Sequence, residues 1–327
     1  SDYDALTSES NGAPLANRAT QGAYPTGSTF KPITSVAALE SGVTTPDESY
    51  VDGGSFTLGG GLTLHNAGGA AYGSVALRKA LQVSSDVFFY HLGAELDAHG
   101  DGQDLQRWAH QLGIGRKTGI DLPAELPGLL PTKKWRDDLY KHKNTDRPWS
   151  TGDNVNLAIG QGDLQADPLQ MAVAYAAIAN GGDVVRPHLG LRVEDAGGRA
   201  LQELHYGIRR HVKINSSYRQ AILDGLSAAA EQPGGTSYPV FGADSSFPIK
   251  IAGKTGTAQR PPNGDQSWYI ALAPYPNPRY VVAVTVENGG FGADTAAPFA
   301  KRIIGALFNA KVKNAGSVGT SAGTPVE

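Results

Sequence analysis

Two apolar segments near the C-terminal end constrain the fold of this chain most strongly. Residues 267–274 (SWYIALAP) and 280–289 (YVVAVTVENG) are rich in aromatic and β-branched residues, and only five residues separate them. So short a connection between two strands permits only an antiparallel hairpin. A third segment of similar character, 249–258, lies shortly before them. We therefore expect an antiparallel sheet here, and not a doubly wound parallel one.

Helical periodicity dominates the chain before this sheet. Ser28 or Thr29 can cap a first helix that Gly42 ends, and Asp167 followed by Pro168 gives the strongest helix-start signal. The expected helices cover residues 30–41, 75–83, 87–96, 104–112, 168–180, 216–230 and 296–310. Elsewhere we expect irregular structure over 1–25, a glycine-dense loop with a short hairpin over 51–73, mostly loop over 114–166, and short peripheral strands over 184–214.

This order of elements predicts an α+β fold. A mostly helical lobe, about 35–165, would lie beside a sheet lobe, about 166–310, and a disordered tail, 311–327, would follow. Composition excludes several classes of function. Without cysteine the chain has no disulfide, thiolate nucleophile or cysteine-ligated metal. A net charge of -3 without a basic stripe argues against a nucleic-acid partner, and no apolar run is long enough to span a membrane.

Three short motifs carry the candidate chemistry. Ser28-Thr29-Phe30-Lys31 has the form S-x-x-K at an expected helix start, so Ser28 Oγ and the Lys31 amine can lie within hydrogen-bonding reach. A neutral Lys31 could take the serine proton, and the free N–H groups of a helix start suit a developing oxyanion. Alone this motif is weak, because a chain of this length contains S-x-x-K about once by chance.

The other two motifs are equally weak in isolation. Ser84-Ser85-Asp86 separates two expected helices, where Ser84 or Asp86 suits a helix cap. Lys254-Thr255-Gly256 lies on an expected strand, where a glycine would let a substrate backbone approach and pair with the strand. Each string has an ordinary structural explanation as a cap or a turn.

Together and in this order, the three motifs form the signature of penicillin-recognising serine acyltransferases. The surrounding strings, NRATQGAYPTGSTFKP, QVSSDVFFYHLG, NLAIGQGDLQADPLQMA and AGKTGTAQ, resemble the transpeptidase domain of class B penicillin-binding proteins. The resemblance covers about residues 12–310 and is strongest to the elongation type (penicillin-binding protein 2-like). It implies an α/β/α sandwich, with a central antiparallel sheet flanked by helices and an attached helical lobe.

The resemblance also implies a function and a role for each motif residue. The family cross-links peptidoglycan stem peptides through a serine acyl-enzyme, and β-lactams acylate the same serine. Ser28 would be the nucleophile, Lys31 its general base, and Ser84 would relay a proton with Lys254. Asp86, Thr255, Gly256 and Thr257 would bind substrate. Backbone N–H groups of Ser28 and Thr257 would form the oxyanion hole.

The family further implies partners and a location. These are stem peptides, the lipid-linked precursor, β-lactams and a membrane glycosyltransferase, at the extracytoplasmic face of the bacterial inner (plasma) membrane. Family domains open with two strands upstream of the nucleophile, preceded by a pedestal and a membrane anchor. This chain begins after the position of those strands, so we expect them and the anchor to be absent from it.

No cofactor is implied. Some elongation-type relatives hold zinc through Asp, His and Cys, and Asp47, Asp52 and His65 lie in the corresponding interval here. Because no cysteine exists, we expect loop side chains and no metal site. We expect the basic segment to be solvated surface; its basic residues are Lys133, Lys134, Arg136, Lys141, His142, Lys143 and Arg147. Four aromatic residues, Trp135, Trp149, Trp268 and Tyr269, are expected to pack and not to form ligand platforms. Trp268 and Tyr269, beside the third motif, are the first candidates for an exception.

Two alternative functions use the same motifs. A serine β-lactamase would also need a glutamate-held water to hydrolyse the acyl-enzyme, and no E-x-x-L-N element is present; Glu125 lies in a proline-rich loop. A non-catalytic β-lactam sensor domain would be acylated and would signal through a fused transmembrane segment. Slow release of bound penicillin would separate the transpeptidase from the β-lactamase.

Overall fold

A three-stranded antiparallel sheet organises the computed structural model, which describes residues 2–8, 10 and 12–312. Its strands are β9 (Ala252–Arg260), β10 (Asn263–Ala273) and β11 (Tyr280–Val286), in the order β11-β10-β9. The expected hairpin is β10–β11, whose register runs from the Ser267–Val286 pair to the Ala273–Tyr280 pair. The antiparallel sheet predicted from the sequence is therefore confirmed, with β9 at its edge.

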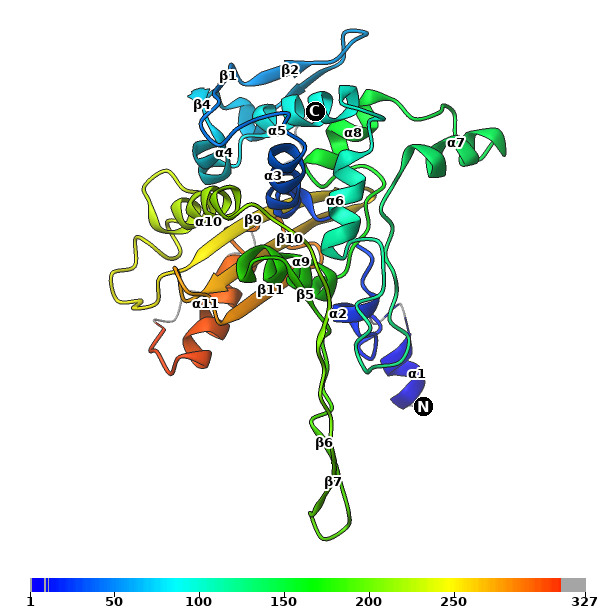
Figure 1. The fold of residues 1–327 in the computed structure, drawn as a ribbon, viewed down its shortest axis with the longest axis vertical. Coiled ribbons are helices and arrows are strands. Elements are labelled where there is room, and N and C mark those ends of the chain that lie inside the picture. Colours follow the sequence, from blue (N-terminus) through cyan, green and yellow to red (C-terminus); the bar gives the residue numbers. More distant parts are fainter. Residues whose placement is uncertain (1, 9, 11, 313–327) are drawn as a thin grey trace.

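Helices cover both faces of this sheet (Figure 1). Alternate residues of β10 enter two different cores, as strand geometry requires. Trp268, Ile270 and Leu272 pack in the larger core with α9 (Pro168–Asn180) and α3 (Lys31–Glu40). The residues between them pack in a second core with α11 (Ala296–Leu307). The result is the helix–sheet–helix sandwich expected from the family resemblance.

The larger core continues into a group of helices around α3. Every residue from 31 to 39 of α3 is buried, and the helix contacts α5 (Asp86–Ala98), α6 (Asp104–Leu112) and α10 (Ser216–Glu231). The glycine-dense segment above α5 forms two strand pairs. They are β1 (Tyr50–Asp52) with β4 (Gly73–Val75), and the expected short hairpin β2 (Ser55–Thr57) with β3 (Thr63–His65). The other helix in this group is α4 (Leu77–Val83).

Most of residues 114–166 are loop, as expected, but the sequence prediction missed two helices there. These are α7 (Lys133–Lys141) and α8 (Thr151–Ala158). Each begins with a side-chain cap, because Thr132 Oγ1 accepts from the N–H of Trp135 and Ser150 forms a capping box with Asp153. Two short helices, α1 (Asp2–Thr7) and α2 (Arg18–Gln21), also interrupt the region that we expected to be irregular.

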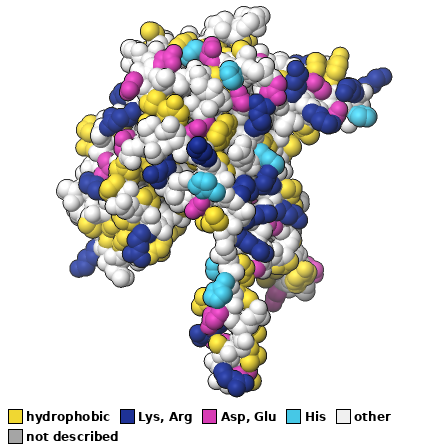
Figure 2. All heavy atoms as spheres, viewed as in Figure 1, with side chains coloured by type: hydrophobic (Ala, Val, Ile, Leu, Met, Phe, Trp, Pro, Cys, Tyr) yellow, Lys and Arg dark blue, Asp and Glu magenta, His cyan; other side chains and the backbone are white. Residues whose placement is uncertain are grey.

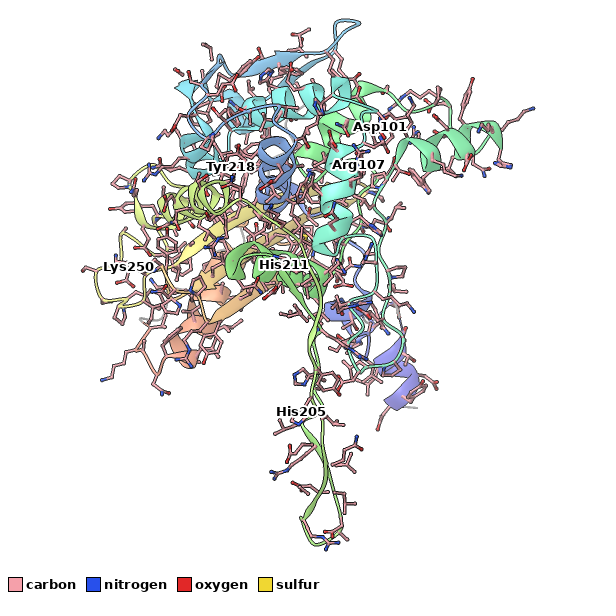
Figure 3. All side chains as sticks on the ribbon, in the orientation of Figure 1. Asp101, Arg107, His205, His211, Tyr218 and Lys250 are labelled. Atoms are coloured by element: carbon pink, nitrogen blue, oxygen red, sulfur yellow. The ribbon has the colours of Figure 1, made fainter. Side chains whose placement is uncertain are left out.

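An extended arm projects from the body. Strands β5 (Asp183–Val185) and β8 (Ile208–His211) pair at its base, and β6 (Arg192–Glu194) pairs with β7 (Ala200–Glu203) near its tip. Figure 1 shows this arm pointing away from the sheet, and Figure 3 places His205 on it and His211 beside the body. The short strands expected over 184–214 are thus confirmed.

Two sequence predictions remain open. The division into lobes at 35–165 and 166–310 stays a proposal, and the tail predicted for 311–327 lies outside the described residues except at Lys311 and Val312. None of the described helices is long and apolar enough to cross a lipid bilayer.

Candidate active site

Ser28 lies in a tight turn, the 3-10 helix η2 (Gly27–Phe30), which leads directly into α3. The turn is held from two sides. The N–H of Gly27 donates to the carbonyl of Gly160 at 2.9 Å, and a Cβ at Gly160 would collide with the Gly27 carbonyl oxygen. On the other side Gly27, at φ +53°, approaches β9 so closely that a Cβ would lie 2.5 Å from the Thr257 carbonyl oxygen. Glycines therefore allow the turn to fit against β9, with Ser28 still partly exposed.

Lys31 joins the first two motifs. Its fully buried ammonium donates to Asp86 Oδ1 at 2.6 Å, to the Ser84 carbonyl at 2.7 Å and to Ser84 Oγ at 3.2 Å. No hydrogen bond links it to Ser28 in the part of the chain that the structure describes. Burial lowers the pKa of Lys31, and the adjacent Asp86 carboxylate opposes this by raising it. The direct Ser28–Lys31 contact expected from the sequence is thus replaced by contacts to the second motif.

The second motif forms the junction between α4 and α5. Ser84 ends α4 in the left-handed conformation at φ +60°, and Ser85 is the N-cap of α5, since its Oγ accepts from the N–H of Phe88 at 3.0 Å. Of the two cap candidates from the sequence, Ser84 is confirmed as the C-cap of α4, whereas Asp86 does not cap α5. Asp86 is instead the first helical residue of α5, where the helix dipole favours a carboxylate. Both Ser84 and Asp86 consequently face Lys31.

A buried network that the sequence analysis missed holds this junction in place. The Asn66 Oδ1 accepts from the N–H groups of Asp86 (2.7 Å) and Val87 (2.9 Å), and its Nδ2 donates to both oxygens of the Asp52 carboxylate. Asp52, with no exposed surface, also accepts from Ser85 Oγ at 2.5 Å. These contacts join residues 14 to 33 positions apart, so no local pattern could have revealed them.

Lys254 reaches the same place from β9. It is fully buried, and its Nζ donates to the Thr255 carbonyl at 3.2 Å. No carboxylate forms an ion pair with it among the described residues. Burial and then the positive charge of Lys31 hold its pKa well below the usual range, while Asp86 raises it. Two buried lysines beside one carboxylate favour a state in which one amine is neutral, as a general base requires.

The remaining residues of the third motif line β9. Pairing with β10 puts Lys254 and Gly256 on one face of the strand and Thr255 and Thr257 on the other. The missing Cβ of Gly256 makes room for the nucleophile's turn, because a Cβ would lie 2.8 Å from the Thr26 carbonyl oxygen. The sequence interpretation that this glycine also lets a substrate backbone approach stays a prediction. Thr255 Oγ1 donates to Thr236 Oγ1, and Thr257 Oγ1 accepts from the N–H of Gly292.

Comparison with known proteins identifies the arrangement. A family model described as the penicillin binding protein transpeptidase domain matches residues 1–305. The chain belongs to the penicillin-binding protein transpeptidase family. It is 34% identical over 319 residues to the peptidoglycan D,D-transpeptidase MrdA of Haemophilus influenzae, covering 91% of this chain and 46% of that relative. The chain thus spans about half the length of the curated relatives that it matches.

Solved structures agree with this membership. Penicillin-binding protein 2 of Pseudomonas aeruginosa, in complex with WCK 5153, is 32% identical with a TM-score of 0.82, and the match covers 96% of this chain and 68% of that chain. A complex between penicillin-binding protein 2 and MreC of Helicobacter pylori matches with 27% identity and a TM-score of 0.77. That match covers 94% of this chain and 53% of the other.

The other candidate residues from the sequence do not gather at this site. Asp47 and His65 are exposed while Asp52 is buried in its network, and the described residues contain no group of three or more possible metal ligands. Trp268 and Tyr269 have no exposed surface, so the expectation that they pack in the core is confirmed and neither is an exception. The basic segment forms α7 and the turn after it, where acidic partners include Asp138, Asp146, Asp153 and Asp163.

Proposed function

We propose that this chain is the catalytic domain of a peptidoglycan D,D-transpeptidase with Ser28 as nucleophile. The observation that carries the proposal is the convergence of Lys31, Ser84, Asp86 and Lys254 beside the turn that bears Ser28. Family membership gives this cluster its chemistry, since relatives along most of the chain bear the name D,D-transpeptidase.

Acyl transfer would proceed in two steps. Ser28 Oγ attacks the carbonyl carbon of the penultimate D-Ala while its proton passes to Lys31, and the N–H groups of Ser28 and Thr257 stabilise the oxyanion. The peptide bond then breaks, and the departing D-Ala amine takes a proton through Ser84 and Lys254. In the second step an amine of another stem peptide attacks the ester, loses its proton to the same groups and releases Ser28.

Substrate contacts would come from the exposed edge of β9. A stem peptide lying along this edge would meet Thr255 and Thr257, whose hydroxyls suit a terminal carboxylate, and Asp86 would contact a substrate amide. The close fit of Gly256 against the nucleophile's turn supports this arrangement, because it fixes the distance between Ser28 and the strand edge.

The partners and location follow from the same proposal. They are stem peptides, the lipid-linked precursor and β-lactams, with a membrane glycosyltransferase as partner, at the extracytoplasmic face of the bacterial inner membrane. A related penicillin-binding protein 2 forms a complex with MreC, which supports a protein partner for the longer protein.

Intact mass after incubation with benzylpenicillin tests the proposal. We expect one penicilloyl adduct per chain, absent in Ser28→Ala and retained in the control Ser217→Ala, which changes an exposed serine of α10. Ser84→Ala should slow acylation by ~10²–10⁴-fold, as loss of a proton relay does. The adduct should persist for hours, whereas rapid release would favour the β-lactamase. An adduct in Ser28→Ala would overturn the assignment of the nucleophile.

A further inference from the structure

Five cationic side chains gather where the arm leaves the body. They come from the loop after α6, the residue after β5, and β8; we call Arg116, Lys117, Arg186, Arg209 and Arg210 the arginine cluster. Figure 2 shows dark blue side chains concentrated just above the arm. A Cβ built on Gly119 would lie 3.2 Å from Arg209 Nη1 and 3.9 Å from Arg186 Nε, so these two guanidinium groups flank the same glycine.

The cluster has no acidic partner. None of its members forms an ion pair with a carboxylate in residues 2–8, 10 and 12–312, although most described basic side chains of α6 and α7 do. Arg186, Arg209 and Arg210 donate instead to backbone carbonyls, at 2.9, 2.6 and 2.7 Å. Each guanidinium carries five N–H donors, so these contacts leave donors unused.

The nearest carboxylates are already occupied. Glu125 accepts from the N–H groups of Thr118 and Gly119, and Asp121 accepts from those of Leu189 and Gly190. Both carboxylates therefore brace the loop and the arm, and among the described residues neither forms a direct ion pair with a member of the cluster.

This concentration of charge is unfavourable in the free protein. Burial, followed by the charges of Arg116 and Arg209, lowers the pKa of Arg210 to about 10. Burial and then Arg209 lower the pKa of Arg116, whose Nε is buried without a hydrogen-bond partner. Residues that repel one another and keep unused donors suit a site whose anionic ligand relieves the repulsion.

We propose that the arginine cluster binds an anionic phosphate group, carried by a free diphosphate or by a lipid headgroup. Guanidinium forks match the oxygens of phosphate in bidentate fashion, which a lysine surface does not provide. Arg186 and Arg209 flank one glycine, and Arg116 keeps a buried Nε without a partner. Neighbouring guanidinium groups of this kind favour a phosphate oxyanion over a single carboxylate. This inference does not depend on the acyl-transfer reaction.

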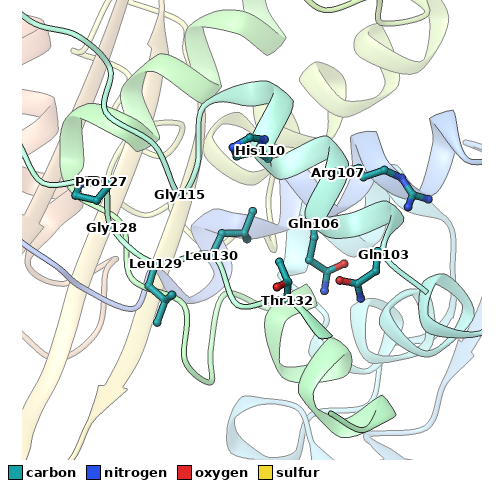
Figure 4. A pocket seen from close by; sticks show the side chains of 10 residues that line it. All are labelled: Gln103, Gln106, Arg107, His110, Gly115, Pro127, Gly128, Leu129, Leu130 and Thr132. Atoms are coloured by element: carbon teal, nitrogen blue, oxygen red, sulfur yellow. The ribbon is translucent and has the colours of Figure 1, made fainter. Parts of the chain in front are cut away.

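A cavity of about 470 Å³ adjoins the cluster and distinguishes the two sources. Figure 4 shows it between α6 and residues 115–132, with Leu129 and Leu130 on one wall and His110 on another. His110 lines the cavity and contacts Arg116 of the cluster, so the cavity lies directly beside the cluster. A lipid would place its headgroup on the cluster and apolar chain atoms in the cavity, whereas free diphosphate would use the cluster alone.

Calorimetric titration with inorganic pyrophosphate tests the site, and sedimentation with vesicles tests the lipid form. The vesicles are phosphatidylcholine alone and phosphatidylcholine with phosphatidylglycerol. The variant Arg116→Gln/Arg209→Gln should weaken binding by about a hundredfold, about tenfold for each lost charge-assisted contact. The control Arg192→Gln/Arg199→Gln changes net charge equally but removes arginines of the arm that are paired with Glu194 and Asp195.

Arg116→Gln alone guards against misfolding, because the contact that its side chain gives up is the one to His110. It should bind about tenfold more weakly than the wild type while penicillin acylation is unchanged. Binding of pyrophosphate, or of phosphatidylglycerol vesicles only, supports the proposal and identifies the source. The proposal is overturned if neither binds, or if the cluster variant and the control lose affinity equally.

Discussion

Replacing Asn66 by alanine tests the network that positions the second motif. The Asn66 Nδ2 donates its two hydrogens to the Asp52 carboxylate and the Ala70 carbonyl, and the Asn66 Oδ1 accepts from the N–H groups of Asp86 and Val87. A buried donor left without a partner costs roughly 1–3 kcal/mol. The loss of partners for the two helix N–H groups alone should therefore lower the free energy of unfolding by about 3 kcal/mol. That is a large share of the roughly 5–15 kcal/mol by which a domain is stable.

Asn66→Ala should also slow the chemistry. Freed from Asn66, the first turn of α5 no longer fixes Asp86 against Lys31, and we expect acylation by a fluorescent penicillin to slow by about tenfold or more. Urea unfolding measures the stability, and the acylation rate is measured well below the unfolding midpoint. The control is Asn215→Ala, which removes the exposed N-cap of α10 and should cost about 1 kcal/mol without changing acylation.

Two results would refute this reasoning. If Asn66→Ala lost no more stability than Asn215→Ala, the buried N–H groups would have found other partners. If Asn66→Ala lost stability and yet acylated at the wild-type rate, the network would support the fold without positioning Asp86.

Two further predictions concern residues around the nucleophile's turn and α9. Gly160→Ala should reduce the acylation rate by at least about tenfold, because the added Cβ collides with the Gly27 carbonyl. The control Gly181→Ala, with no atom near its Cβ position, should cost only backbone strain. Equal acylation rates in the two variants would contradict this prediction. Burial raises the pKa of Asp167 to about 7, so its contribution to stability is present at low pH and is lost as pH rises from about 4 to 7. Asp167→Asn keeps an N-cap and should therefore unfold at a higher temperature than the wild type at pH 8, but not at pH 4. If the difference in unfolding temperature were the same at both pH values, ionisation of Asp167 would not control this stability.

The parts of the fold that the sequence predicted were those with strong local signals. Helix α9 begins at a capping box between Asp167 and Gln170, and α6 ends at Gly113 in the left-handed conformation. The β10–β11 hairpin needed only two apolar runs and a short connection. Helix α7 was missed because charged residues hide its periodicity, and α8 because it is short and contains Gly152 and two asparagines, which are weak helix formers.

The residues of the site also fall into two groups, those that the sequence predicted and those that only the structure shows. The three motifs named Ser28, Lys31 and Lys254 without any structure, because their order is a family signature. The Asn66–Asp52–Ser85 network and the fit of Gly160 against Gly27 join segments far apart in the sequence. Such contacts depend on how α3, α5 and β9 pack together, and a single sequence does not record that packing.

Asp86 presents the sharpest question about the chemistry, since its carboxylate works against Lys31 as a base. Burial lowers the pKa of Lys31, and Asp86 at 2.6 Å raises it toward the charged form, while Lys254 repels the extra proton. Asp86→Asn removes the opposing charge but nearly keeps the shape of the side chain. The pKa of Lys31 should then fall further, and the acid limb of the acylation-rate profile between pH 5 and 9 should move to lower pH. An acid limb that stays in place or moves to higher pH would show that Asp86 does not set the protonation of Lys31. Its role would then be that of a carboxylate in the first turn of α5, where it stabilises the positive end of the helix dipole by about 0.3–1 kcal/mol.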